Sequence, residues 1–260
     1  MKRLLVLLTL LVAVCMGVEA KKPQGDVQYN IIYLGNSITY GALHADRNKT
    51  APPVVATAEV MKKYEVLNSA NCGRSGATTV DFLPSMNRDF KRVEKAIAKY
   101  KEQEGQASVQ MKYVFSIMLG TNDSASTGPT GAPVSNEDYK KNLLSIIGRC
   151  RELCPDAIFV LQRPVWYSPN TYNGARYLVA GLNRVTDYVN VLEELADEND
   201  DIYLGDCDSY NLFKQEYQKY MFAEPGNAGT FYLHPNEAGA AKMAKNWAKA
   251  IVSAVKSSAR

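Results

Sequence analysis

The stretch Asn30-Ile31-Ile32-Tyr33-Leu34-Gly35-Asn36-Ser37 joins a short apolar run to a glycine and a polar loop. An apolar run of this length that ends at turn residues is typical of a strand buried on both faces. Four later segments show weaker or similar β-type runs, namely 65–68, 112–119, 157–161 and 201–204. The chain is therefore predicted to contain five strands.

Helical patterns fill the intervals between these runs. They cover 80–101, 136–153, 174–198 and 236–255, the last being an alanine-rich amphipathic segment. Strands that alternate with helices predict a parallel sheet covered on both faces. We therefore expect a three-layer α/β/α sandwich with a five-stranded parallel sheet, in one domain that spans residues 21–260, because no repeat or linker interrupts the pattern.

The first twenty residues have the layout of a secretory signal peptide. A short basic start precedes the apolar run Leu4–Val14, and small residues stand near a cleavage point after Ala20. The apolar run is too short to span a bilayer as a stable helix, so no stable membrane insertion is expected after cleavage. Acylation of Cys15 is the alternative, although Val14 is bulkier than the residue expected before a lipid-modified cysteine. An exported protein, periplasmic or secreted, is predicted.

Charge and cysteine content restrict the classes of partner. Removal of residues 1–20 takes away Lys2, Arg3 and Glu19, which changes the formal net charge from +3 to +2. No basic run is dense enough to predict nucleic-acid binding. The four remaining cysteines permit disulfides outside the cytosol, and free buried thiols fit equally well; these cysteines are Cys72, Cys150, Cys154 and Cys207. The only histidines, His44 and His234, have no metal-type spacing to them, so no metal or cofactor is expected.

The functional groups of a parallel α/β sheet collect in loops at the carboxyl ends of its strands. Here those loops, together with the start of the last helix, carry a serine, a glycine turn, an asparagine and a histidine. The four blocks are Gly35-Asn36-Ser37-Ile38, Asn71-Cys72-Gly73-Arg74-Ser75-Gly76, Gly120-Thr121-Asn122-Asp123 and His234-Pro235-Asn236. Acyl transfer needs groups of these types, namely an activated hydroxyl, a base and donors aimed at an oxyanion.

In these four blocks the chain resembles the SGNH (GDSL-like) hydrolase superfamily, and the resemblance extends over residues 30–255. It implies a flavodoxin-like fold and an ester hydrolase without a cofactor. It also implies that Ser37 is the nucleophile and His234 the base, with an oxyanion hole formed by the N–H groups of Ser37 and Gly73 and by the amide of Asn122. Asp123 is expected only to organise its turn.

One position departs from the pattern of the family. The family places an aspartate three residues before the histidine, where this chain has Phe231. A carboxylate there would orient the imidazole and stabilise its cation. Either His234 acts with a backbone carbonyl, or a carboxylate arrives from Asp206, Asp208 or Glu224.

The expected activity is hydrolysis of short-chain esters, acetyl esters of carbohydrates above all, through an acyl-serine intermediate. The segment Arg163–Tyr167 could supply an aromatic surface for a sugar, or only pack in a loop. A thioesterase or lysophospholipase is the enzymatic alternative. The alternative from another class is a catalytically silent SGNH module that binds a glycan, motivated by Phe231. The acyl group, the alcohol and the oligomeric state stay open.

Overall fold

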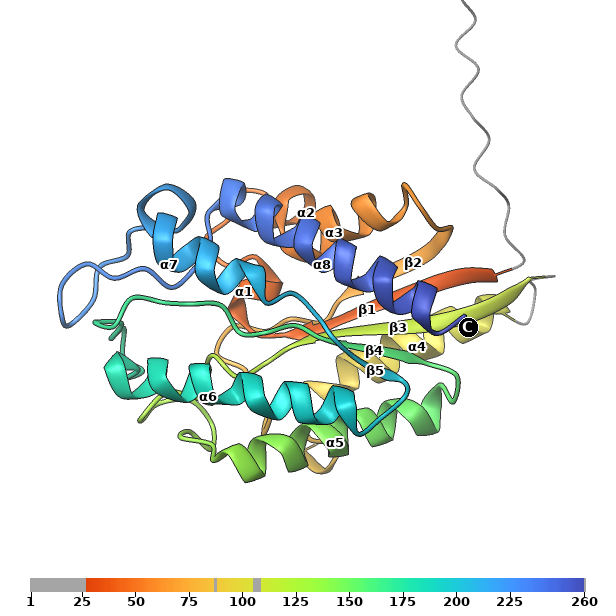
Figure 1. Cartoon of the computed structure of the whole chain (residues 1–260), viewed down its shortest axis with the longest axis horizontal. Helices are drawn as coiled ribbons and strands as arrows, with labels where there is room; N and C mark the ends of the chain where they lie inside the picture. The colour runs from red at the N-terminus through yellow and green to blue at the C-terminus, as the bar shows by residue number, and fades with distance from the viewer. Residues whose placement is uncertain (1–26, 87, 105–108, 260) are drawn as a thin grey trace, which may run out of the picture.

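A computed structural model describes residues 27–86, 88–104 and 109–259. Its centre is a five-stranded parallel sheet, as the sequence predicted, and its strands lie in the order β2-β1-β3-β4-β5 (Figure 1). The strands are β1 (Val27–Gly35), β2 (Val66–Asn71), β3 (Gln110–Met118), β4 (Ile158–Leu161) and β5 (Ile202–Leu204). The predicted signal peptide lies outside the described residues.

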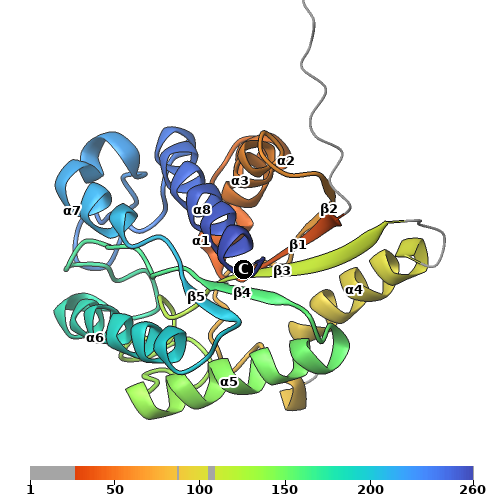
Figure 2. The same ribbon diagram turned by 45° about the vertical axis from the view of Figure 1, so that its right-hand side comes forward.

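Two layers of helices enclose the sheet, as Figures 1 and 2 show. One layer contains α2 (Arg47–Thr50), α3 (Pro52–Val60), α7 (Asp208–Tyr220) and α8 (Glu237–Ser257). The opposite layer contains α4 (Phe90–Glu104), α5 (Asn136–Leu153) and α6 (Leu178–Asp197). The five-stranded three-layer architecture expected from the sequence is thus confirmed.

Alternation along the central strand explains why its sequence is apolar throughout. Ile31 and Tyr33 belong to the core on the α8 side of the sheet, where Tyr33 stacks on Trp247. Ile32 and Leu34 belong to the core on the α5 side. Successive side chains of a strand point to opposite faces, so a strand covered on both faces needs an apolar residue at every position.

Several helical segments differ from the sequence-based expectation, and α2 and α3 were not predicted. The pattern over 80–101 predicted one helix, but α4 begins only at Phe90, after a loop and a 3-10 turn at Pro84–Met86. The buried carboxylates Asp81 and Asp89 hold this loop through ion pairs to arginines. Residues 208–220 form α7, which the hydrophobic pattern did not reveal; Glu216 interrupts its helical backbone.

The direction of the strands places all loops that follow them at one end of the molecule. In Figure 1 this is the left-hand end, where the loop after α7 also lies. After β1 the chain adds β2 on one side, and it then returns to add β3, β4 and β5 on the other side of β1. The direction in which strands are added therefore reverses at β1. Ligands of open α/β sheets bind at such a switch point.

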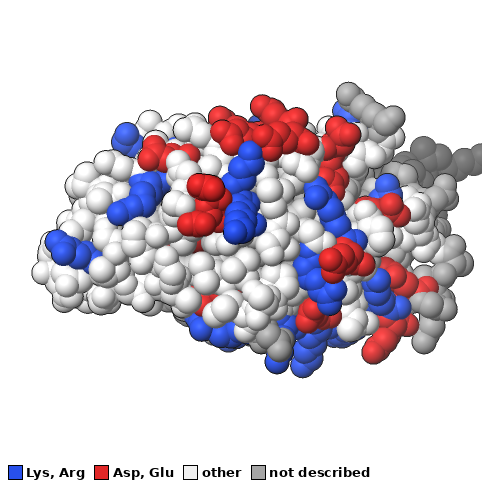
Figure 3. Space-filling view, turned by 90° about the horizontal axis from the view of Figure 1, so that it is seen from below, with Lys and Arg blue, Asp and Glu red and all other residues white. Residues whose placement is uncertain are grey.

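In the view from below, basic and acidic side chains intermix over the middle and right of the molecule (Figure 3).

Candidate active site

Ser37 is the first residue of the short helix α1 (Ser37–Tyr40), directly after β1. Asn36 caps this helix, since its Oδ1 accepts a hydrogen bond of 2.9 Å from the N–H of Ile38. A Cβ at Gly35 would lie 2.9 Å from the carbonyl oxygen of Met118, so the turn before Ser37 needs glycine. The strand and the cap together hold the hydroxyl of Ser37 at the carboxyl end of β1.

His234 faces this hydroxyl, with its Nε2 2.9 Å from Ser37 Oγ. On its other side, Nδ1 lies 2.9 Å from both carboxylate oxygens of Glu224. The backbone N–H of His234 also donates to Glu224 Oε1, at 3.1 Å. A carboxylate only accepts hydrogen bonds, so the Nδ1 of neutral His234 carries the proton and Nε2 is free to accept from Ser37.

The backbone of Glu224 is paired with that of Phe231 in an isolated antiparallel bridge. Each residue donates its N–H to the carbonyl oxygen of the other at 2.9 Å. Phe231 itself is buried in the core on the α8 side. The family places its aspartate at the position of Phe231. In this chain the carboxylate that contacts the imidazole comes instead from Glu224, the residue paired with Phe231 in the bridge.

Asp206 and Asp208 have other contacts. Asp206 accepts hydrogen bonds from the N–H groups of Asp208 and Ser209, at 2.9 and 3.0 Å, and from the hydroxyl of Ser209. Asp208 occupies the first turn of α7, where a negative charge is favourable. Of the three carboxylates considered from the sequence, it is Glu224 that the structure brings to His234.

The two glycines of the second loop are placed differently. Gly73 is buried, and its N–H donates to Asn71 Oδ1 at 3.0 Å. Gly76, three residues later, is exposed, adopts a φ of +78° and lines the same cavity as Ser37. The N–H of Gly73 is therefore used within its own loop, contrary to the expectation that it faces an oxyanion, and Gly76 is the glycine of this loop that lines the cavity. Nothing in the sequence distinguished these two glycines, because both follow a strand and both suit a turn.

Asn122 lines the cavity from the loop after β3. Its Nδ2 donates to the carbonyl oxygen of Ala77 at 2.8 Å, and its Oδ1 accepts from the hydroxyl of Tyr177 at 2.6 Å. A carbonyl can only accept, so these partners fix which end of the amide is the NH2. The second hydrogen of Nδ2 remains for a ligand in the cavity. Tyr177, just ahead of α6, was not identified from the sequence.

Asp123 organises the loop that carries Asn122. It accepts hydrogen bonds from the N–H groups of Gly120 and Thr79, at 3.1 and 2.8 Å, and from the Thr79 hydroxyl. Complete burial raises the pKa of Asp123 to about 6, although these hydrogen bonds act in the opposite direction. This carboxylate has the structural role expected from the sequence.

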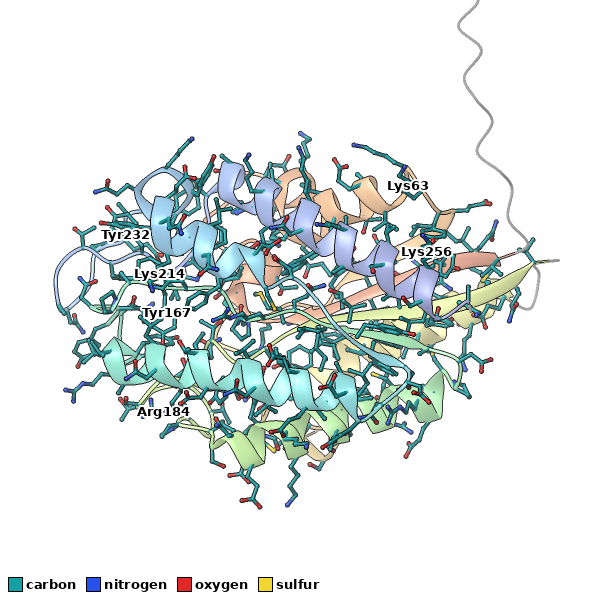
Figure 4. All side chains as sticks on the ribbon, in the orientation of Figure 1. Lys63, Tyr167, Arg184, Lys214, Tyr232 and Lys256 are labelled. Carbon is teal, nitrogen blue, oxygen red and sulfur yellow. The ribbon has the colours of Figure 1, made fainter. Side chains whose placement is uncertain are left out.

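Other side chains considered from the sequence lie in the framework. Within Arg163–Tyr167, Trp166 is only 6% exposed and Tyr167 is buried, so this segment presents no aromatic surface for a sugar. Figure 4 shows Tyr167 between the helix layers, with Tyr232 nearer α7 at the same end. His44 lies between Thr50 Oγ1, at 2.9 Å, and the carbonyl oxygen of Pro235, at 3.2 Å. It links the segment after Ser37 to the loop of His234.

The cavity beside Ser37 has a volume of about 590 Å³. Small and polar residues dominate its lining, which comes from five segments of the chain and includes Ser37, Gly76, Asn122, Tyr177, His234, 128–130 and 173–175. The cysteines Cys72, Cys150, Cys154 and Cys207 are free thiols. Within the described residues, no three metal-binding side chains gather at one point, and no helix is long and apolar enough to cross a membrane.

Comparison with known proteins identifies the family of the chain. Residues 33–242 match the model of the GDSL-like Lipase/Acylhydrolase family. A search of curated protein sequences finds no match.

Solved structures of similar fold include an acetylxylan esterase from Geobacillus stearothermophilus, with 17% identity, a TM-score of 0.57, and coverage of 85% of this chain and 93% of that one. An α/β hydrolase enzyme from the metagenome of Lake Arreo has 19% identity, a TM-score of 0.53 and coverage of 86% and 94%. A structure described as a GDSL-like lipase, from Parabacteroides merdae, has 17% identity, a TM-score of 0.55 and coverage of 86% and 95%.

The match covers most of the chain and includes Ser37, Gly76, Asn122 and His234. The chain therefore belongs to the GDSL-like lipase/acylhydrolase family and is a carboxylic ester hydrolase.

Proposed function

We propose that this protein hydrolyses short-chain esters of carbohydrates, acetyl esters above all, through an acyl intermediate on Ser37. The observation that carries the proposal is the chain of contacts from Ser37 Oγ through His234 to Glu224, with each step at 2.9 Å. A nucleophile, a base and an oriented carboxylate in this order form the arrangement that activates a serine.

The first step forms the acyl-serine. Ser37 Oγ attacks the ester carbonyl carbon while His234 Nε2 takes the hydroxyl proton, and the carboxylate of Glu224 stabilises the resulting imidazolium. The carbonyl oxygen becomes an oxyanion that the N–H groups of Ser37 and Gly76 and the Nδ2 of Asn122 stabilise. The first N–H groups of a helix have no partner inside it, so the N–H of Ser37 is suited to this role. His234 then protonates the alcohol as the C–O bond breaks.

The second step returns the free enzyme. Water enters the position that the alcohol has left, and His234 Nε2 removes its proton as it attacks the acyl carbon. The tetrahedral intermediate collapses, Ser37 Oγ recovers the proton from His234, and the carboxylic acid departs. The groups that stabilise the oxyanion act identically in both steps.

The lining of the cavity supports a short acyl group and a polar alcohol. Among the described residues that form it, Leu233 is the one large aliphatic side chain, whereas glycine, serine and asparagine each occur more than once. A long acyl chain would need a larger apolar surface, because its binding energy grows with the apolar area that it buries. The Geobacillus neighbour is an acetylxylan esterase, which agrees with this choice.

The direct test compares wild type with Ser37→Ala on p-nitrophenyl acetate and with a fluorophosphonate probe. Wild type should turn over the ester and be labelled at Ser37, whereas the variant should do neither. Failure of wild type to react with both reagents would instead favour a glycan-binding module without chemistry.

A series of p-nitrophenyl esters from acetate to palmitate, together with acetylated sugars and an acyl thioester, then tests the substrate class. Preference for acetyl esters is expected. Preference for long chains would favour a lysophospholipase, and preference for the thioester would favour a thioesterase.

We also infer that the protein is exported, on the basis of the signal-peptide layout of residues 1–20. N-terminal sequencing of the protein from an expressing bacterium should begin at Lys21. A chain that keeps Met1, or that carries a lipid on Cys15, would contradict cleavage after Ala20.

A further inference from the structure

Two arginines, Arg74 and Arg88, line the cavity that contains Ser37. Apart from His234, they supply its charged side chains, and no carboxylate of the described residues lines it. Arg74 lies two residues before Gly76, on the loop that contributes to the proposed oxyanion hole. The mechanism described above uses neither guanidinium.

Two buried carboxylates hold these guanidinium groups. Arg74 Nε lies 2.5 Å from Asp89 Oδ2, and Arg88 Nη2 lies 3.0 Å from Asp81 Oδ1. Arg74 Nη2 also lies 2.8 Å from Asp81 Oδ2, and both contacts with Asp81 are ion pairs without the alignment of a hydrogen bond. The side chain of Asp81 is fully buried, so its carboxylate fixes the positions of the guanidinium groups in the free protein.

The cluster carries more positive than negative charge. Arg92 approaches Asp89 as a third guanidinium, with its Nε 3.9 Å from Oδ1. Three guanidinium groups thus share two carboxylates, and one positive charge is left over. A ligand with one negative charge would balance the cluster.

Arg88 is the member of the cluster best placed for such a ligand. Its side chain is 50% exposed and lines the cavity. Its ion pairs with Asp81 and Asp89 use Nη2 and Nε, which leaves the N–H groups of Nη1 for another acceptor. A planar guanidinium matches the geometry of a carboxylate, and hydrogen bonds between the two are stronger than neutral ones.

We propose that Arg88, supported by Arg74, forms a subsite that binds a carboxylate of the ester substrate, so that the preferred substrate is an acetylated sugar acid such as an O-acetylated uronic acid. This proposal rests on the proposed function of the same cavity. A volume of about 590 Å³ is within the usual range for a pocket that binds a small ligand. The acetyl group would lie at Ser37 while the carboxylate of the sugar ring contacts Arg88.

Binding to a Ser37→Ala protein tests the subsite without any turnover. Calorimetry would compare acetylated methyl glucuronoside with acetylated methyl glucoside, which has a hydroxymethyl group in place of the carboxylate. The glucuronoside should bind about ten- to hundredfold more tightly, the range expected for hydrogen bonds to a charged group. Equal affinity for the two sugars would overturn the proposal, whatever the variants below show.

Arg88→Gln in the Ser37→Ala background should remove most of this preference. Arg92→Gln is the matched control, because Arg92 faces the same buried Asp89 but does not line the cavity. This variant should prefer the glucuronoside over the glucoside as strongly as the Ser37→Ala protein does. Loss of preference in both variants would assign the effect to the net charge of the cluster and would overturn a direct contact with Arg88. Retention of preference in Arg88→Gln would also overturn it.

The two proposals can fail separately. Failure of wild type to hydrolyse p-nitrophenyl acetate would contradict the esterase mechanism, whereas the calorimetric comparison would still report on the subsite. Hydrolysis of neutral acetylated sugars with no affinity for the glucuronoside would contradict the subsite alone.

Discussion

Glu224 and Phe231 exchange both of their backbone hydrogen bonds across an isolated antiparallel bridge. The bridge brings a carboxylate from ten residues before His234 to within 2.9 Å of its Nδ1. Phe231 meanwhile fills the core on the α8 side. The two residues of the bridge thus have different roles. Phe231 anchors the loop in the core, and Glu224 supplies the carboxylate that contacts His234.

Replacement of Glu224 by glutamine should lower kcat by about a hundred- to ten-thousandfold, because an amide cannot stabilise the imidazolium as a carboxylate does. KM for p-nitrophenyl acetate should change little, since Glu224 faces His234. Steady-state kinetics of purified Glu224→Gln checks this.

Asp208→Asn is the matched control, because Asp208 is another of the carboxylates considered from the sequence but lies in the first turn of α7. Its kcat should stay near that of wild type. Wild-type rates in Glu224→Gln would show that His234 works without this carboxylate.

Tyr177→Phe should lower kcat by about two- to tenfold while leaving KM nearly unchanged. The Tyr177 hydroxyl donates to Asn122 Oδ1 at 2.6 Å and so orients the amide whose Nδ2 is proposed to stabilise the oxyanion. Loss of one neutral hydrogen bond costs about 0.5 to 1.5 kcal/mol, which sets the size of the effect.

Direct removal of the donor gives the scale for comparison. Asn122→Ala should lower kcat by about a hundred- to thousandfold. An effect of Tyr177→Phe confined to KM, or one that exceeds that of Asn122→Ala, would contradict a role through Asn122.

Asp123 should make the protein less stable as the pH rises, which is the opposite of the usual effect of a carboxyl group. Its pKa in the fold is raised to about 6 from a reference of 3.8, so the native state binds this proton more tightly than the unfolded chain. The favourable contribution of the protonated group is complete below about pH 4 and declines as the pH rises through about 6.

Urea unfolding of wild type and Asp123→Asn at several pH values measures this contribution, since the variant lacks the titrating group. The free energy of unfolding of wild type relative to the variant should fall by about 2 kcal/mol from pH 4 to pH 7, because each unit of pKa shift is worth about 1.4 kcal/mol and part of the contribution is already lost at pH 4. A difference that is constant or that rises over this range would contradict the raised pKa.

The cysteines should react slowly in the native protein. Burial raises the pKa of both Cys72 and Cys154 to about 12, and it also raises the pKa of Cys150 and Cys207. The thiolate is the reactive form, so alkylation near neutral pH should be slow. Cys207 is the least buried of the four and should react first.

Timed alkylation with iodoacetamide, followed by peptide mass spectrometry, checks the order. The same reaction in denaturant, where all four should be modified rapidly, is the control. Fast labelling of Cys72 or Cys150 in the native state would show that their surroundings open readily.

Much of the fold followed from local patterns in the chain. The run Ile31–Leu34 has the apolar continuity that burial on both faces demands, and the alternation of such runs with helical segments permits few arrangements other than a covered parallel sheet. Residues 208–220 escaped prediction, although Tyr210 and Phe213 stand at helical spacing and are buried on one side of α7.

The sequence by itself determined that Ser37, Asn122 and His234 are candidates, because each stands at a strand end or a helix start where parallel topology gathers functional groups. Only the tertiary structure decided which groups assist them. Gly73 donates its N–H to Asn71 whereas Gly76 lines the cavity, and Glu224 reaches His234 through a backbone bridge to Phe231. Such choices depend on contacts between segments and on local backbone angles, which the spacing of residues along a chain does not specify.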